Sequence, residues 1–145
     1  MIKGYTAGVY DLFHIGHLNL LKNAKAKCDY LIVGITTDEL VRYKGKSPVI
    51  TLAERMEIVK AIKYVDEVVV QDDLDKVKAW EKYHYDVLFV GSDWKGTDKW
   101  NEYERQLKQK GAEVCYLPYT VTTSSTLITK VLKDLSENTN LKVVA

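Results

Sequence analysis

The sequence predicts an α/β fold, namely a single Rossmann-like, doubly wound domain with a five-stranded parallel sheet. Short apolar runs alternate with helical patterns along the chain, which is typical of βαβ units. The runs at residues 31–35 and 87–90 are apolar without alternation, as expected of strands covered on both faces. The length of 145 residues suits one domain with one core.

Five strands are expected, at residues 2–8, 30–37, 67–71, 86–91 and 113–117. Five helices are expected, at residues 15–27, 52–62, 74–83, 99–110 and 125–135. Thr51 followed three residues later by Glu54 predicts a capping box, and Gly111 predicts a helix end. We therefore expect one domain over residues 1–135, followed by a tail over residues 136–145 that is frayed or takes part in an oligomer contact.

The composition allows most classes of globular enzyme but gives no global positive field. Hydrophobic residues make up 46% and charged residues 28% of the chain, and the formal net charge is +1. Nucleic-acid binding is therefore not expected, and any site for an anion must be local. Cys28 and Cys115 lack metal-ligand spacing, so we interpret both as packed thiols. No run of 18 apolar residues occurs, which predicts a cytoplasmic protein without a membrane segment.

The segment that follows the first expected strand contains two histidines three residues apart, His14 and His17, which open a helix. This spacing places both on one face of the helix, beside unpaired backbone N–H groups and a positive partial charge. Two imidazoles there can hydrogen-bond phosphate oxygens, and Gly16 lets a phosphate approach closely. Ligands of such sheets bind beyond the carboxyl ends of the strands, which is where this pair is expected.

The pair has two other interpretations. A histidine in an amphipathic helix is more often packed or solvated than functional, but a structural role at this position would not call for two imidazoles. A zinc site is the rival chemistry. Two histidines without a carboxylate at ligand spacing make poor zinc coordination, so phosphate chemistry is favoured.

Residues 8–17 resemble the HxGH signature of the nucleotidyltransferase superfamily that is related to class I aminoacyl-tRNA synthetases. The similarity continues through residues 35–39, 44–46, 54–55, 64–68 and 91–96. Together these motifs resemble the bacterial glycerol-3-phosphate cytidylyltransferases as far as about residue 128. The resemblance implies transfer of CMP from CTP to a phosphorylated small molecule, with glycerol 3-phosphate as the expected acceptor and CDP-glycerol and pyrophosphate as products. It also implies Mg²⁺ carried with CTP, and a homodimer.

The resemblance assigns roles to individual positions. The catalytic group is His14, His17 and Lys46, and the acceptor is expected to contact Lys44, Arg55, Asp38 and Asp66. The expected CTP-binding residues are Val9, Tyr10, Asp11, His14, Gly16, His17, Lys46, Lys63, Gly91, Asp93, Trp94, Tyr119, Thr120, Ser124, Ser125 and Thr126. No metal ligand is assigned, because the triphosphate and water are expected to hold most of the coordination sphere of Mg²⁺.

Some of these positions have simpler interpretations, and two depart from the family. The Lys44 and Lys46 pair could be a solvated loop, and Trp94 could be a core residue. Tyr119 stands where the family carries an arginine, and Lys63 also replaces an arginine. These departures leave the acceptor more open than the reaction.

Two other functions remain open at this level. The first is an adenylyltransferase of the same superfamily that uses ATP and a sugar or pantetheine phosphate. The second is a non-catalytic nucleotide-binding module, against which the presence of both histidines and both lysines argues. A tRNA synthetase fragment is excluded, because the chain has no room for an anticodon-binding domain.

Overall fold

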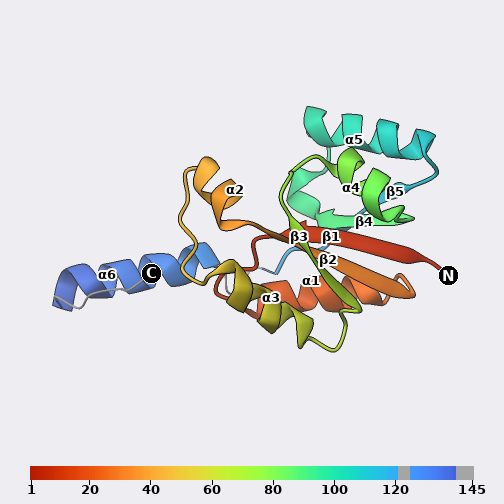
Figure 1. Cartoon of the computed structure of the whole chain (residues 1–145). Helices are drawn as coiled ribbons and strands as arrows, with labels where there is room; N and C mark the ends of the chain where they lie inside the picture. Colours follow the sequence, from red (N-terminus) through yellow and green to blue (C-terminus); the bar gives the residue numbers. More distant parts are fainter. Residues whose placement is uncertain (121–124, 140–145) are drawn as a thin grey trace.

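The computed structural model describes residues 1–120 and 125–139. Its centre is a sheet of five parallel strands in the order β3-β2-β1-β4-β5 (Figure 1). The strands are β1 Lys3–Gly8, β2 Tyr30–Thr36, β3 Glu67–Gln71, β4 Val87–Gly91 and β5 Glu113–Leu117. The predicted fold class is confirmed, and each predicted strand lies within one or two residues of its observed bounds.

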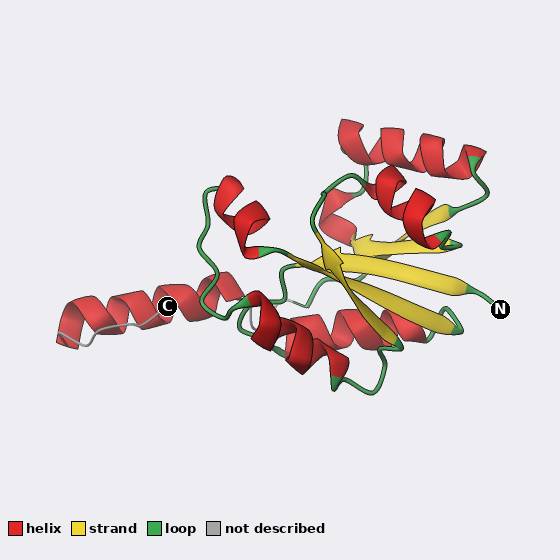
Figure 2. Cartoon of the chain, viewed as in Figure 1, coloured by secondary structure: helices red, strands yellow, loops and turns green. Residues whose placement is uncertain are grey.

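Helices cover both faces of this sheet (Figure 2). Helices α1 (Ile15–Lys25) and α3 (Leu52–Lys60) lie on one face, where Leu21 and Val59 pack with Val33 of β2. Helices α4 (Lys76–Tyr83) and α5 (Asp98–Gln109) lie on the other face, where Leu107 packs with Tyr5 of β1. Both faces of the central strands are thus buried, as their unalternating apolar sequences predicted.

Two short elements were not predicted, the helix α2 (Asp38–Tyr43) and the 3₁₀ turn η1 (Ser92–Trp94). Each is too short for an apolar period to show in the sequence. The predicted capping box is wrong: Thr51 precedes α3, but its side chain makes no capping hydrogen bond. Gly111 follows α5 with φ of +84°, the left-handed conformation that a glycine helix end provides.

The last helix, α6 (Ser125–Thr139), points away from the sheet (Figure 1). It continues through the boundary predicted at residue 135, so four residues of the expected tail are helical. Residues 140–145 lie outside the described part of the chain. No helix among the described residues is long and apolar enough to cross a membrane.

The strand order opens a crevice at one edge of the sheet. From β1 the chain runs outward through β2 to β3, and it then returns to place β4 on the other side of β1. β1 pairs with β2 over six residue pairs, but with β4 only through Gly4 with Val87 and Tyr5 with Leu88, near its amino end. The carboxyl ends of β1 and β4 therefore border the position where α/β proteins bind ligands.

Candidate active site

The two histidines fold onto one another at the start of α1. His14 is the residue that caps the helix, and its Nδ1 accepts the Gly16 N–H at 3.0 Å. The His14 N–H is donated in turn to Nδ1 of His17 at 3.3 Å, and the two rings stack with centroids 3.8 Å apart. Each imidazole thus satisfies one backbone donor of the first turn.

These hydrogen bonds define what the rings offer to a ligand. Burial lowers the pKa of His14, and burial followed by repulsion from His14 lowers the pKa of His17 to about 4. Both imidazoles are therefore neutral near pH 7. A neutral imidazole whose Nδ1 accepts a hydrogen bond carries its proton on Nε2. Each ring consequently has one N–H donor, at Nε2, that these backbone contacts leave available for a phosphate oxygen.

A strained loop holds the pair in place. Tyr10 and Leu12 adopt positive φ angles of 54° and 49°, which side chains other than glycine rarely do. The Tyr10 ring is 5% exposed and lies in the core, while the Asp11 carboxylate accepts the N–H groups of Val49 and Ile50 at 2.8 and 2.9 Å. The loop before α1 is thereby tied to both the core and the segment that precedes α3.

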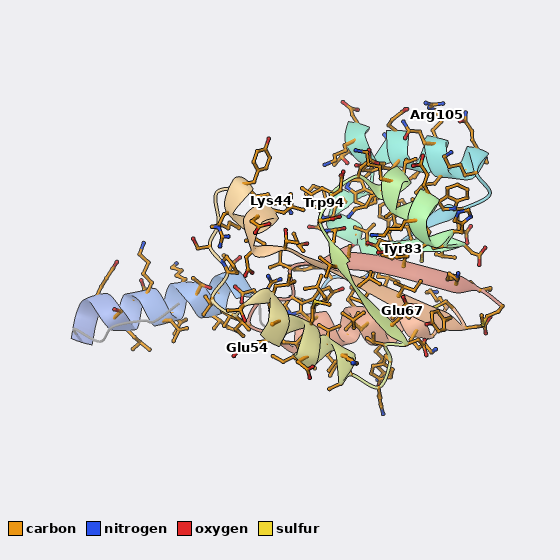
Figure 3. All side chains as sticks on the ribbon, viewed as in Figure 1. Lys44, Glu54, Glu67, Tyr83, Trp94 and Arg105 are labelled. Atoms are coloured by element: carbon orange, nitrogen blue, oxygen red, sulfur yellow. The ribbon has the colours of Figure 1, made fainter. Side chains whose placement is uncertain are left out.

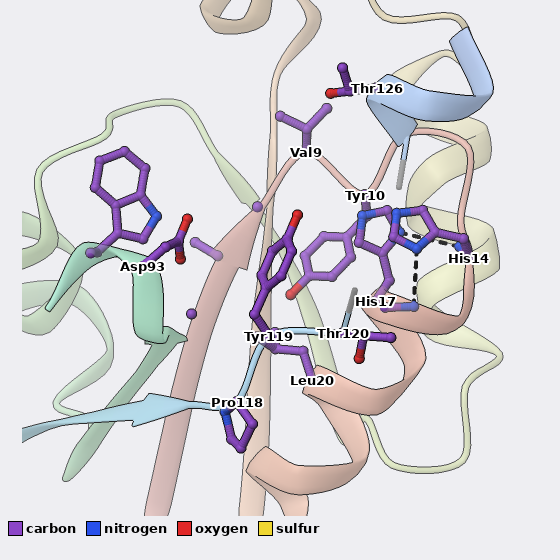
Figure 4. Close-up of a pocket in the computed structure, with 15 residues that line it drawn as sticks. Val9, Tyr10, His14, His17, Leu20, Asp93, Pro118, Tyr119, Thr120 and Thr126 are labelled. Atoms are coloured by element: carbon purple, nitrogen blue, oxygen red, sulfur yellow. Dashed lines mark hydrogen bonds between the residues drawn. The ribbon is translucent and has the colours of Figure 1, made fainter. Parts of the chain in front are cut away.

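A cavity of about 320 Å³ lies beside the histidines (Figure 4). In that view the imidazoles and Asp93 lie on opposite sides of Tyr119. The predicted CTP-binding residues that line it are Val9, Tyr10, His14, Gly16, His17, Gly91, Asp93, Trp94, Tyr119, Thr120 and Thr126. The fold thus brings together residues that follow β1, β4 and β5, which are far apart in the chain.

The loop after β4 forms the wall opposite the histidines. Trp94 is 49% exposed and lines the cavity, so the alternative of a core residue is excluded. A Cβ at Gly91 would lie 2.8 Å from Oδ1 of Asp93, so only glycine leaves this carboxylate in its place. Thr120 is held from the other side, because its Oγ1 accepts a hydrogen bond from Asn19 of α1 at 3.2 Å. Asn19 was not predicted, since nothing local distinguishes it.

A second cavity, of about 600 Å³, adjoins the first and shares Val9, Tyr10, His17 and Thr126 with it. Its other lining residues include Lys46 together with Lys130 and Lys133 of α6. The two α6 lysines were missed by the sequence reasoning. Their three-residue spacing on the same helix face as Thr126 and Thr129 was the available signal. His17 therefore borders both a mixed cavity and one with three lysines, while His14 borders the first.

Arg55 has a different position from the one predicted. It is fully buried, and Nη1 donates to the carbonyls of Val9 (2.7 Å) and Thr36 (2.9 Å), Nε donates to Ile50 O, and Nη2 bonds Asp38. With four of its five N–H donors used by the protein, Arg55 positions the ends of β1 and β2, and the predicted contact with the acceptor is corrected accordingly. Asp38 keeps 28% of its side chain exposed, so its contact with the acceptor stays a prediction.

Lys63 and Asp66 lie at the opposite edge of the sheet. Both precede β3, and the parallel topology places that segment at the amino ends of the strands. Asp66 accepts the Leu31 N–H at the start of β2 and pairs with Lys25 at 2.6 Å. Their predicted roles in CTP and acceptor binding are therefore corrected: within this chain neither residue reaches the histidine pair.

The remaining predicted residues are Lys44, Ser124 and Ser125. Lys44 follows the last turn of α2, and in Figure 3 it lies with Trp94 toward the carboxyl edge of the sheet. Ser125 begins α6, whereas Ser124 lies outside the described residues. No group of three or more His, Cys, Asp or Glu residues in the described part of the chain could hold a metal ion.

Comparison with known proteins adds three similarities. The chain matches the family described as Cytidylyltransferase-like over residues 5–134. It is 39% identical over 137 residues to the glycerol-3-phosphate cytidylyltransferase of Bacillus spizizenii, covering 93% of this chain and 100% of that protein. It is 31% identical over 138 residues to the FAD synthase of Thermococcus sibiricus, covering 94% and 93%.

Among solved structures, the lipopolysaccharide core biosynthesis protein from Thermoplasma volcanium aligns with a TM-score of 0.71 at 26% identity, over 85% of this chain and 99% of that one. The family match contains every residue that lines the two cavities. The similarity therefore extends to the site as well as to the sheet.

Proposed function

Because the chain belongs to the cytidylyltransferase-like family, we propose that it transfers CMP from CTP to glycerol 3-phosphate, releasing CDP-glycerol and pyrophosphate. The resemblance predicted from the motifs is confirmed by the family match. The observation that carries the proposal is the location of the histidine pair, because both rings line the first cavity and His17 also lines the second. One cavity is walled by Trp94 and Asp93, and the other by three lysines.

This arrangement suits each part of a nucleoside triphosphate. Cytosine and ribose occupy the cavity near Trp94, where aromatic and backbone groups surround them. The α-phosphate lies at the two Nε2–H donors, and the β- and γ-phosphates extend into the cavity with Lys46, Lys130 and Lys133. The lysines balance the charge that leaves with pyrophosphate.

The chemistry needs no covalent intermediate on the protein. An oxygen of the acceptor phosphate attacks the α-phosphorus in line while the bond to the pyrophosphate oxygen breaks. Charge grows on the oxygens of the attacked phosphorus and on the leaving group. Donors aimed at such charge contribute about 2.7 to 4 kcal/mol each, which makes the His14 and His17 pair the main source of rate.

Mg²⁺ is included in the proposal as a companion of CTP. The Asp11 carboxylate near the site already accepts two backbone N–H groups. This favours coordination of Mg²⁺ by the triphosphate over coordination by this carboxylate. An ion held by triphosphate oxygens and water needs no protein cage. Bound in this way, Mg²⁺ neutralises phosphate charge. Addition of EDTA to the transfer assay should stop product formation, and excess Mg²⁺ should restore it.

We also infer a homodimer and a cytoplasmic location. Leu127, Val131 and Leu135 of α6 are each nearly half exposed and recur every four residues, so they form one apolar stripe on the helix. Stripes of this kind are favourable contacts between chains. A reaction that consumes CTP also needs a compartment that supplies it. A monomer mass by light scattering at micromolar concentrations would contradict the dimer.

The deciding experiment measures pyrophosphate release with each of the four nucleoside triphosphates and a panel of acceptors. CTP with glycerol 3-phosphate should give the highest kcat/KM. The FAD synthase relatives favour an adenylyltransferase as the second candidate, so the panel includes ATP with FMN. Preference for that pair would replace the proposal, and binding of CTP without turnover on any acceptor would indicate a non-catalytic module.

A further inference from the structure

The chain leaves the core at the end of β5. Leu117, the last residue of this strand, is 1% exposed and packs in one apolar cluster with Leu21 of α1. The next two residues are exposed. For residues 118–120 the structure describes one side-chain hydrogen bond, which Nδ2 of Asn19 in α1 donates to Oγ1 of Thr120 at 3.2 Å. Asn19 therefore fixes this segment after it has left the core.

Asn19 lies on the helix that carries the histidine pair. This helix is anchored by Leu21 and Ala24, which are both 0% exposed, and His17 precedes Asn19 by two residues. The hydrogen bond to Thr120 is partly buried, so it is stronger than the same bond in water. The position of Thr120 relative to the imidazoles is thus set by one hydrogen bond and a short piece of anchored helix.

The direction of this hydrogen bond decides what Thr120 offers to a ligand. A threonine hydroxyl has one O–H donor and two lone pairs. Because Oγ1 accepts the Asn19 amide, the hydroxyl proton of Thr120 is not used in this contact. Thr120 lines the first cavity together with His14 and His17 (Figure 4). The O–H group is therefore available as a donor to a nucleotide bound in that cavity.

An amide at position 19 is suited to this arrangement. A carboxylate there would accept the Thr120 proton and turn it away from the cavity, and a hydrocarbon side chain would leave the hydroxyl free to rotate. The amide fixes the hydroxyl without adding a charge beside the phosphates. Asn19 itself lines neither of the two cavities, so any influence that it has on the ligand passes through Thr120.

We infer that Asn19 is a positioning residue for the nucleotide, which holds Thr120 so that the Thr120 hydroxyl donates its proton to CTP. This inference rests on the proposed function and deepens it, because Thr120 lines the cavity assigned to cytosine, ribose and the α-phosphate. Each of these parts carries hydrogen-bond acceptors. The same contact joins the helix of the histidines to the segment that leads into α6, whose Lys130 lines the second cavity.

Substitution of Asn19 separates this role from a structural one. Asn19→Leu keeps the size of the side chain and should raise the KM for CTP by about tenfold, with kcat changed by about twofold at most, because a ground-state hydrogen bond is lost. Asn19→Asp should raise the KM for CTP further, since its carboxylate also repels the phosphates. The matched control is Asn23→Leu, because Asn23 lies one turn further along α1 and lines neither cavity. An unchanged KM for CTP in Asn19→Leu would overturn the inference.

A double-variant cycle tests whether Asn19 acts through Thr120. Thr120→Val removes the hydroxyl, keeps the shape of the side chain and should also raise the KM for CTP by about tenfold. The double variant should be weakened by about the same tenfold, because both substitutions break one contact. Independent effects would multiply to about a hundredfold, and that result would contradict the inference.

Binding of CTP with Mg²⁺ in the absence of an acceptor gives the comparison without turnover. The calorimetric Kd for CTP should rise by about tenfold in Asn19→Leu, while the midpoint of urea unfolding stays close to that of the wild type. A lowered midpoint with an unchanged Kd would make the contact structural and overturn the inference. Asn19→Ser, whose side chain is too short to reach Thr120, carries the same test if Asn19→Leu does not fold.

These measurements also separate failure of the inference from failure of the proposed function. If the wild type forms CDP-glycerol and Asn19→Leu has an unaltered Kd for CTP, the inference fails and the function stands. If Asn19→Leu binds CTP more weakly than the wild type, but the wild type forms no CDP-glycerol from glycerol 3-phosphate, the inference stands and the function fails.

Discussion

The two edges of the sheet use charged side chains in opposite ways. At the amino edge, Asp29, Asp86 and Asp66 accept the first backbone N–H groups of β1 and β2, at 2.6 to 2.8 Å. At the carboxyl edge, Lys46, Lys130 and Lys133 line a cavity that His17 also lines. Acidic groups at one edge complete the fold, and basic groups at the other lie where the proposed reaction needs to hold phosphates. Charged residues therefore complete the fold or stay available to a ligand according to the edge on which the topology places them.

Arg55 is the exception at the carboxyl edge, and its removal should have the largest effect on stability. Arg55→Met leaves the Asp38 carboxylate and three carbonyls without their donor. Breaking a buried pair in this way costs about 3 to 5 kcal/mol, which urea unfolding would measure. A variant with wild-type stability but impaired acceptor binding would show that Arg55 contacts the substrate after all.

The histidine pair should have the largest effect on rate. His14→Ala and His17→Ala should each lower kcat by roughly 10²- to 10³-fold, with a smaller change in the KM for CTP, because the lost donors act on the transition state. Steady-state kinetics at saturating substrates would measure this. His84→Asn is the control, since His84 ends α4 with φ of 52°, which asparagine tolerates. Near wild-type turnover in both alanine variants would make the pair structural.

Acid should destabilise the carboxyl edge through His17. Burial lowers its pKa to about 4 in the folded protein, while in the unfolded chain it titrates near about 6.5. Between these values the unfolded chain binds the extra proton, so the free energy of unfolding falls as the pH is lowered and is unaffected above them. The contribution is at most about 3 kcal/mol. Between pH 7 and 4, the free energy of unfolding should depend less on pH in His17→Asn than in the wild-type protein. Equal pH dependence in the two proteins would contradict a buried, neutral His17 ring.

The lysines of α6 should have a moderate effect. Lys130→Gln and Lys133→Gln should each raise the KM for CTP by roughly tenfold, about 1.4 kcal/mol, and weaken inhibition by pyrophosphate, because each removes a charge from the triphosphate cavity. The KM for glycerol 3-phosphate should stay unchanged. Lys108→Gln, on the last turn of α5, provides the control. If inhibition by pyrophosphate were unchanged, α6 would not take part in binding the leaving group.

The amino edge should respond least. Asp66→Asn removes the ion pair with Lys25, both partly exposed, and weakens the bond to Leu31, at a cost of about 1 kcal/mol in stability. The KM values for both substrates should not change in the transfer assay. A higher KM for glycerol 3-phosphate would reinstate Asp66 as an acceptor residue and end the distinction between the two edges.

The sequence by itself determined the features that depend on near neighbours. Apolar periodicity located the strands and the longer helices, and the spacing of His14 and His17 placed both rings at one helix start. The segment around Gly91 was also located correctly, because it follows a strand whose apolar run is distinct. These features needed only local geometry, which the chain encodes within about ten residues.

Only the tertiary structure decided which charged residues meet. Lys63 adjoins a family motif in sequence and Asp66 lies within it, yet the parallel topology carries both to the far edge, because the segment before a strand and the segment after it lie at opposite ends. Burial of Arg55 against Val9 and Thr36, and the meeting of Lys46 with Lys130 in one cavity, depend on contacts between elements that are remote in the chain. The energy of a charge pair depends on the distance between the two groups in space. The spacing of residues in the sequence does not determine that distance.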